Sequence, residues 1–363
     1  MITKLGWRKR GRPKTGKAVS LTDVAALAKV STATVSRVLN SSATVSTEVR
    51  RRVERACHEL AYVPNGAARA LAARRTMTIG AVVPAIENVG IARSVAAFQQ
   101  RLKQASYTLL LASSTYDSAV EMQEVRTLLS RGVDGLMLVG GDHDPGLMDL
   151  IKHHNVPHIE TWTLTQGRLS VGLDNVKAAK LVTHHLINLG HSRIGLIMGR
   201  VIGNDRAALR VQGIRASLME AGLEPSIEWL IDRPYNIADG RMATQALLAS
   251  PNRPTALICG NDQIAFGAMI QAVAEGLKVP DDLSVTGFND LEFAEHLSPP
   301  LTTVRVPTED IGRISAEYLL RAIDDSSFKP TSFEVPATLV VRESTAAWPS
   351  VMRRRTAEGS RRS

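Results

Sequence analysis

Residues 20–40 read SLTDVAALAKVSTATVSRVLN and decide the fold of the amino-terminal end of the chain. Ser20 and Asp23 have the spacing of a capping box, in which the Ser20 hydroxyl accepts from the Asp23 amide and the Asp23 carboxylate accepts from the Ser20 amide. A turn is expected at Lys29-Val30, before a second helix over Thr32–Leu39. Two short helices joined by so tight a turn predict a helix-turn-helix.

A third helix, Thr47–Leu60, is expected to complete this head. The second helix carries short polar side chains and one arginine on the side away from its apolar residues. Such a surface fits the major groove of DNA, where short polar groups and arginine read the base edges. The residues on this face are Thr32, Ala33, Ser36, Arg37 and Asn40. A three-helix bundle without a role in DNA binding is the alternative.

The distribution of charge favours DNA binding over that alternative. The formal net charge of the 363 residues is +9, and it is divided unevenly. Residues 1–76 carry 16 Lys and Arg against 4 Asp and Glu, whereas residues 77–349 carry 23 against 30. Residues 350–363 are again basic, with 5 against 1. A basic head on an acidic body indicates that the head alone binds nucleic acid.

The composition is that of an ordinary soluble globular protein, with 44% hydrophobic and 22% charged residues. No apolar run approaches the ~18 residues that a membrane-spanning helix needs, and no apolar segment of a secretory signal follows the basic first residues. The two cysteines, Cys57 and Cys259, give no disulfide framework. We therefore expect a cytoplasmic protein without a membrane partner.

From Ile79 onward, short apolar runs alternate with amphipathic stretches, which is the pattern of parallel βαβ units. The predicted strands are Thr78–Val83, Thr108–Ala112, Gly135–Val139, Ile194–Met198, Ala256–Cys259 and Leu283–Thr286. About ten such alternations exceed what one small sheet holds. The expected class is α/β, with two doubly wound lobes and a ligand crevice at the carboxyl ends of their strands.

The motifs of both regions resemble the lactose/galactose-repressor (LacI/GalR) family of transcriptional regulators. In the head they are LTDVAALAKVSTATVSRVLN and VSTEVRRRVERACHELAYVPNGAARALA; in the core they are LGHSRIGLIMG, RVQGIRASLMEAGL, TALICGNDQIAFGA and VPDDLSVTGFND. The resemblance covers residues 18–342, and the segment with Glu160 and Val171–Asn175 is most similar to the gluconate-type branch. It implies a helix-turn-helix head, a hinge helix and a two-lobed core similar to periplasmic sugar-binding proteins.

The same resemblance sets the expected domain bounds. They are 1–17 for a basic arm, 18–62 for the helix-turn-helix, 63–76 for the hinge helix and linker, 77–343 for the effector-binding and dimerisation core, and 344–363 for a basic tail. Within the core, the first lobe is expected over 77–173 and 306–331, and the second over 174–305 and 332–343.

Position by position, the resemblance implies roles for the head and the hinge helix, 65–72. The base-reading positions are matched by Thr32, Ala33 and Arg37, with Ser36 on the same face. The hinge residues expected at the minor groove are Asn65, Ala68 and Leu71. Leu71 matches a leucine that wedges between base steps and kinks the DNA. Lys29 departs from the glycine that is frequent at the turn, which costs about 1 kcal/mol if its φ is positive.

In the core, the resemblance implies an effector site between the lobes. The residues expected there are Arg210, Asn261, Asn289, Glu160, Trp162 and Leu173. Asn289 stands where sugar-binding members often have aspartate, and this departure disfavours a polyol held by a carboxylate. Thr163 stands where gluconate-type members often have aspartate. The expected effector is a sugar or sugar acid, with a gluconate-like molecule favoured. Trp162 is either a platform for a sugar face or a core residue.

The segment KRGRPK, residues 9–14, resembles the core of an AT-hook. Gly11 lets the backbone approach the floor of a groove, and Pro13 keeps the chain extended. Arg10 and Arg12 are then expected to enter a narrow minor groove flanking the operator. The alternative is a basic tail that contacts phosphates without sequence preference.

Other functions lack the residues they need. The histidines at 153, 154 and 158 and at 184, 185 and 191 have no carboxylate or thiolate at ligand spacing, so no metal is expected. No phosphate-binding glycine motif, nucleophile elbow or nucleophile–base pair is present, so neither an enzyme nor a cofactor is expected.

A transport-type sugar-binding protein would have no use for residues 1–76. An architectural DNA-binding protein with a ligand-free core is a second rival. The sequence favours a homodimeric repressor of a pseudo-palindromic operator, modulated by a small effector.

Overall fold

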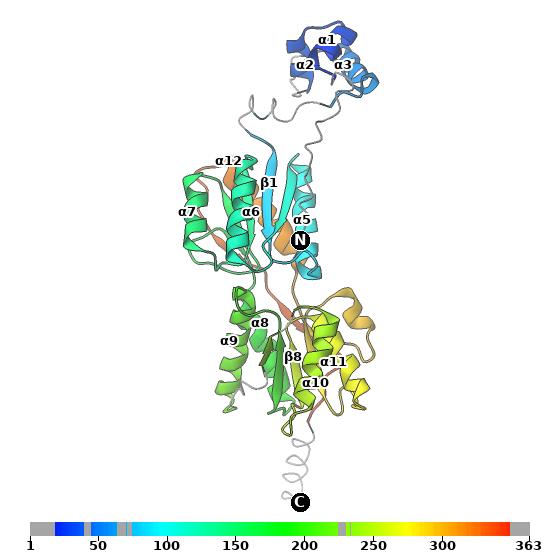
Figure 1. Cartoon of the computed structure of the whole chain (residues 1–363), viewed down its shortest axis with the longest axis vertical. Helices are drawn as coiled ribbons and strands as arrows, with labels where there is room; N and C mark the ends of the chain where they lie inside the picture. The colour runs from blue at the N-terminus through cyan, green and yellow to red at the C-terminus, as the bar shows by residue number, and fades with distance from the viewer. Residues whose placement is uncertain are drawn as a thin grey trace, which may run out of the picture. The chain divides into compact units, whose positions relative to one another are not determined.

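The structure is a computed structural model that describes residues 19–39, 45–63, 70, 75–223, 230–232 and 234–348 (Figure 1). It forms two compact units, a head up to Thr76 and a core from Met77 onward. No helix within the described ranges is long and apolar enough to cross a membrane.

The head consists of three helices that pack around one apolar cluster. They are α1 (Leu21–Ala28), α2 (Thr32–Leu39) and α3 (Thr47–Glu59). Ser20 and Asp23 make the predicted capping box, and the Ser20 amide donates to Asp23 Oδ2 at 2.8 Å. Val24, Val35 and Val53, one from each helix, are fully buried. The predicted helix-turn-helix is confirmed, and α3 ends one residue earlier than predicted.

The turn between α1 and α2 is held in a left-handed conformation. Lys29 caps α1 with a φ of 51°, and its amide donates to the carbonyls of Ala25 and Ala26. Arg52 of α3 donates to the carbonyl of Lys29 at 3.0 Å and to that of Ala28. The turn therefore keeps its shape although a lysine stands where glycine would be unstrained.

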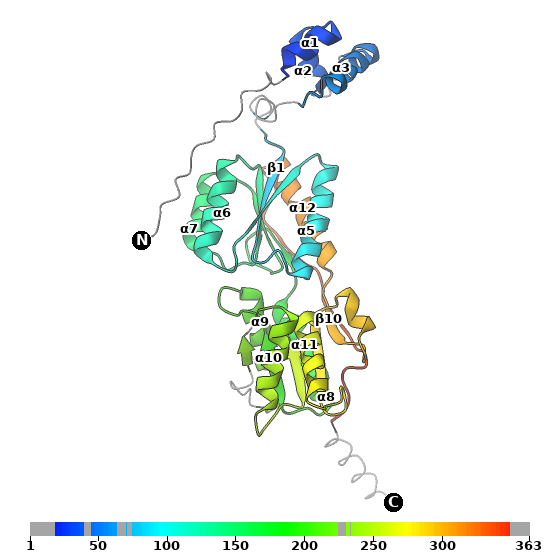
Figure 2. The same cartoon turned by 45° about the vertical axis from the view of Figure 1, so that its right-hand side comes forward.

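The first lobe of the core is a six-stranded parallel sheet with helices on both faces (Figure 2). Its order is β11-β5-β4-β3-β1-β2, built from β1 (Thr78–Val83), β2 (Thr108–Ser113), β3 (Gly135–Val139), β4 (His158–Thr161), β5 (Ser170–Gly172) and β11 (Ser332–Glu334). One face is covered by α5 (Val89–Gln104) and α12 (Thr308–Asp324), the other by α6 (Ser118–Ser130) and α7 (Pro145–His153). Apart from Thr78, which is half-buried, the central strands β1 and β3 are apolar, as expected of strands buried on both faces.

The second lobe repeats this architecture. Its order is β12-β10-β9-β8-β6-β7, built from β6 (Ile194–Met198), β7 (Leu230–Asp232), β8 (Ala256–Cys259), β9 (Ser284–Asn289), β10 (Thr302–Arg305) and β12 (Thr338–Val340), which is antiparallel to β10. One face is covered by α8 (Asn175–Asn188) and α9 (Asp205–Glu220), the other by α10 (Ile237–Leu248) and α11 (Asp262–Ala274); the short helix η2 (Glu292–His296) follows β9. The two predicted doubly wound lobes are confirmed.

The chain passes between the lobes at residues 173–174, 306–307 and 335–337. The third crossing differs from the predicted bound at residue 331. β11 pairs with β5 of the first lobe, with Ser332 opposite Ser170, so the first lobe extends through Glu334. All three residues of β11 are exposed at the sheet edge. Such a strand lacks the run of apolar residues by which buried strands are predicted.

Residues 344–348, which we call the strap, pack against the second lobe. The sequence had suggested instead that a basic tail begins at residue 344. Ser344 is fully buried, accepts from the Thr302 amide at 2.8 Å and donates to the Val285 carbonyl at 2.6 Å. The Trp348 amide donates to the Leu189 carbonyl at 2.7 Å. In a sequence, short polar residues that will make internal hydrogen bonds cannot be told from those of a solvated tail.

Candidate functional site

The predicted DNA-reading face lies on α2. Thr32, Ala33 and Arg37 are exposed and Ser36 is half-buried, while Val35 on the opposite side is fully buried. Ser31 precedes the helix and accepts from the Thr34 amide at 3.1 Å, which fixes where α2 begins. The geometry leaves the three exposed side chains free of the helix packing, as reading of base edges requires.

Several predicted DNA-binding residues fall outside the described part of the chain. They are Arg10, Arg12, Asn40, Asn65, Ala68 and Leu71. The hinge helix and the basic arm therefore remain predictions.

A cavity of about 460 Å³ lies between the two lobes of the core. Its walls come from the carboxyl ends of strands in both lobes, where doubly wound folds bind their ligands. The first lobe contributes Ala85, Glu87, Asn88 and Tyr116, and the second contributes Arg200, Asp232 and Tyr235. Burial raises the pKa of Tyr116 to about 12, so its phenol stays a neutral hydrogen-bonding group.

The predicted effector residue Arg210 lies behind Tyr235, not on the cavity wall. Its Nη2 donates to the Tyr235 hydroxyl at 2.9 Å and its Nη1 donates to Asn175 Oδ1 at 3.2 Å. The guanidinium also stacks 4.5 Å from the centre of the Phe288 ring. Its Nε is buried and has no acceptor among the described residues. A buried guanidinium with one unused donor beside a cavity is a site for an additional oxygen atom.

Two further predicted residues join Arg210 at the meeting of the lobes. Asn175 donates to the carbonyl of Trp162 at 3.0 Å, which links the first lobe to Arg210. At Gly90 an added Cβ would lie 3.1 Å from the Trp162 ring and 3.3 Å from Asn289 Nδ2, so both side chains pack against this glycine. Trp162 is 7% exposed and belongs to the core cluster, and both Trp162 and Asn289 have positive φ, 71° and 106°.

The end of β9, which carries Asn289, is held in place by Asp262. This carboxylate is fully buried and accepts from the Leu291 amide at 2.6 Å and from the Thr303 hydroxyl at 2.5 Å. Burial is the main reason that the pKa of Asp262 rises to about 7. Asn261, the preceding residue, caps α11 by accepting from the Ile264 amide at 2.8 Å. Asn261 thus has a structural task in addition to its predicted place near the crevice.

Two predicted effector residues do not meet the others. Glu160 is fully buried in β4 and forms a 2.6 Å ion pair with Arg168, while its second oxygen has no partner among the described residues. Leu173 is 2% exposed and packs in the core cluster. Neither residue lines the cavity between the lobes.

Four residues that the sequence did not single out are central to the crevice. They are Asn175, Phe288, Tyr116 and Tyr235. The ring of Tyr235 lies directly over Gly199, where any added Cβ would overlap it, and 3.3 Å from a Cβ added at Gly260. Both glycines directly follow predicted strands, and a glycine at that position was the one sign in the sequence that a bulky ring packs there. Among the described residues, no group of three His, Cys, Asp or Glu side chains is arranged to hold a metal ion.

Models of two protein families match the chain. The model described as "Bacterial regulatory proteins, lacI family" matches residues 20–65, and the model described as "Periplasmic binding protein-like domain" matches residues 183–345. The first covers the head and the second covers most of the second lobe and part of the first.

The chain is also similar to known proteins over most of its length. It is 36% identical over 327 residues to the ribose operon repressor of Haemophilus influenzae, covering 90% of this chain and 98% of that one. It is 32% identical over 329 residues to the transcriptional repressor PurR of Vibrio vulnificus, covering 89% and 98%. A crystal structure of the lac repressor dimer bound to operator and the anti-inducer ONPF matches with a TM-score of 0.82 and 30% identity, covering 91% of this chain and all of that one.

Proposed function

The chain belongs to the lacI family of bacterial regulatory proteins and is a DNA-binding transcriptional repressor with an effector-binding core, not an enzyme. From that premise we propose that a sugar or sugar acid, held between the two lobes, controls its affinity for an operator. A small molecule acts in this way when it binds one arrangement of the lobes better than the other.

The observation that carries the proposal is the buried Arg210 guanidinium beside the cavity between the lobes. Its Nη groups are bound by Asn175 and Tyr235, and its Nε lacks an acceptor. A ligand hydroxyl or carboxylate would supply that oxygen. Tyr116 and Tyr235 supply ring faces on either side of the cavity, and sugar rings present apolar C–H faces to such surfaces.

The choice between a neutral sugar and a sugar acid is open to experiment. The gluconate preference drawn from the segment around Glu160 loses support, because Glu160 is buried against Arg168 away from the cavity. One relative is a ribose operon repressor, and its name does not single out a sugar acid. The cavity wall itself carries the acids Glu87 and Asp232 against the single base Arg200.

The partners of the repressor are operator DNA and a second copy of the chain. The exposed face of α2 reads a few base pairs, and useful affinity therefore needs two heads on one pseudo-palindromic site. The solved lac repressor, which resembles this chain across 91% of its length, is a dimer on its operator. We propose the same assembly here, with residues 65–72 as a hinge helix that folds against the minor groove.

The effector proposal is tested by titration calorimetry of the full chain with D-ribose and with D-gluconate. We expect binding of one of them, and we expect Arg210→Lys to abolish it, because lysine offers one compact charge in place of a planar fork. Arg215→Lys, on the same helix, is the matched control and should bind as the wild type does. Absence of heat with both ligands would contradict a sugar or sugar acid, and unchanged binding by Arg210→Lys would remove Arg210 from the site.

A further inference from the structure

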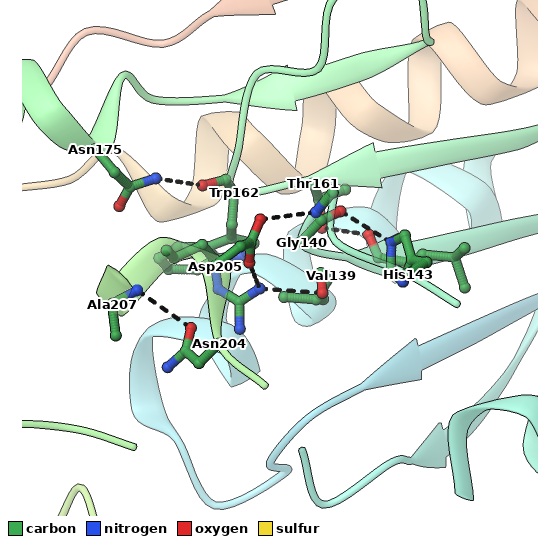
Figure 3. A network of polar contacts seen from close by, with 12 residues as sticks. Val139, Gly140, His143, Thr161, Trp162, Asn175, Asn204, Asp205 and Ala207 are labelled. Carbon is green, nitrogen blue, oxygen red and sulfur yellow. Dashed lines mark hydrogen bonds and ion pairs between the residues drawn. The ribbon is translucent and has the colours of Figure 1, made fainter. Parts of the chain in front are cut away.

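Helix α9 of the second lobe clasps a turn of the first lobe at the carboxyl end of β3 (Figure 3). The turn consists of Val139, Gly140 and Gly141, and the clasping residues are Asp205 and Arg206 in the first turn of α9. These two side chains are not among the predicted effector residues, and they line not the 460 Å³ cavity but a second cavity of about 300 Å³ between the lobes.

Three hydrogen bonds make the clasp. The Gly141 amide donates to Asp205 Oδ2 at 2.8 Å, and Arg206 Nη1 donates to the Val139 carbonyl at 3.1 Å. Arg206 Nη1 also donates to Asp205 Oδ1 at 2.8 Å, so the two clasping side chains hold each other in place. The side chain of Arg206 is only 9% exposed and that of Asp205 only 15%, and solvent therefore screens these charges little.

The turn is shaped to receive the clasp. Gly140 has a φ of +106°, and a Cβ at this residue would overlap Arg206 Nη1 and lie 2.8 Å from Asp205 Oδ1. Its carbonyl lies 3.1 Å from His143 Nε2, and His143 Nδ1 lies 3.0 Å from Glu121 Oε2. The first lobe thus fixes the turn from its own side, while the second lobe grips it from the other.

We propose that Asp205 and Arg206 are positioning residues that hold the two lobes together before any effector binds. The hydrogen bonds of Gly141 and Val139 to α9 join the two lobes. They exist only while the lobes are in contact at this turn, and they are lost when the lobes move apart there. Contacts made in one of two states shift the balance toward that state. Arg210 lies one turn further along α9, so the clasp and the effector contact move as one rigid helix.

The proposal is tested with Arg206→Ala and Gly140→Ala, the second of which expels Arg206 without changing either clasping side chain. Gly167→Ala is the matched control. Gly167 also has a positive φ, +75°, but an added Cβ there has no atom within 4 Å. Both glycine variants therefore strain the backbone, and only Gly140→Ala meets the clasp.

Hydrogen exchange of the full chain, followed by mass spectrometry, is the readout that needs no effector. A hydrogen bond to a charged acceptor is strong enough that its loss should accelerate exchange at the Gly141 amide by about 10- to 100-fold. We expect this acceleration, and faster exchange at the cavity wall around residues 85–88, in both clasp variants but not in Gly167→Ala. Exchange in the clasp variants equal to that of the control overturns the proposal.

A second arm separates positioning from a general loss of stability. If Gly140→Ala fails to fold, Asp205→Asn decides the matter, because it keeps the side-chain volume and weakens both bonds of the carboxylate. Affinity for a DNA duplex selected with the wild-type protein should change in the clasp variants at unchanged melting temperature, while Gly167→Ala binds as the wild type does. This arm rests on the proposed function and the exchange arm does not. Faster exchange with unaltered DNA affinity would refute the link between clasp and operator.

Discussion

Acidification should release the strap from the second lobe, because His191 holds it there in the neutral form. His191 is 2% exposed, with Nδ1 2.9 Å from the Thr255 hydroxyl and Nε2 3.1 Å from the Ala346 carbonyl. Nε2 also lies 3.0 Å from the Ser284 hydroxyl, which accepts from the Ala346 amide. Burial is the main reason that the pKa of His191 falls to about 4.

The size of the effect follows from this pKa. In the unfolded chain a histidine takes up its proton near pH 6.5, whereas His191 in the folded chain does so at about pH 4. A lowered folded pKa gives stability that is present above pH 6.5 and is lost as the pH falls toward 4. Each pH unit in this window costs up to about 1.4 kcal/mol, so His191 alone should cost about 3 kcal/mol by pH 4.

Urea unfolding of the wild type and of His191→Gln between pH 4 and pH 7 measures this cost. The variant should be less stable at pH 7, because Thr255 and Ala346 lose a partner, and the two free energies of unfolding should converge by about 3 kcal/mol on acidification. His184→Gln, an exposed histidine of α8, is the control and should follow the wild type. Parallel curves for the wild type and His191→Gln across this range would show that His191 does not hold the strap as a neutral group.

Three further predictions concern the head and the clasp. Lys29→Gly should raise the thermal stability of the head by about 1 kcal/mol, since Lys29 pays for a left-handed φ that glycine adopts freely; a fall in its melting temperature would contradict this. Burial lowers the pKa of His143, but the hydrogen bond and charge of Glu121, the charge of Glu160 and the Gly140 carbonyl together raise it above its usual 6.5. His143 should therefore stabilise the core below pH 6.5 and lose that effect as the pH rises through the raised value. Urea midpoints that fall with pH in the wild type but not in His143→Gln would verify it, and equal pH dependence would refute it. Arg37→Ala should weaken operator binding by about 1–3 kcal/mol and relax one base position, whereas uniform weakening on all sequences, measured by gel shift, would make Arg37 a phosphate contact.

Strands built on an apolar run were predictable, and short strands that contain polar residues were not. β1, β3, β6 and β8 have the predicted bounds, because strands buried between two helical layers are mostly apolar and these four read as apolar runs. β9 is displaced by one residue at its start and extends to Asn289. β4, β5, β7, β10, β11 and β12 were not among the predicted strands, because each is only three or four residues long and contains at least one polar residue, which breaks the apolar pattern.

The DNA-reading face was predictable because it lies on one helix. The effector site was not, because its side chains come from distant parts of the sequence and meet only in the folded core. The exposed face of α2 follows from its helical period alone. Glu160 was placed at the crevice by resemblance, but its partner Arg168 comes from the loop after β4 and removes it from the cavity. Tyr116 and Tyr235 are isolated aromatics in loops, and only the joining of the two lobes brings them to one cavity.

The three passages of the chain between the lobes also set the order in which the protein can be completed as it leaves the ribosome. The first sheet needs β11 and the second needs β12, so the first is not whole until residue 334 has been made and the second not until residue 340, and the strap follows later still. The head has its own apolar cluster and depends on contacts within residues 19–63. Local contacts form sooner than distant ones. Synthesis that stops before residue 332 therefore yields a finished DNA-reading head joined to two unfinished lobes.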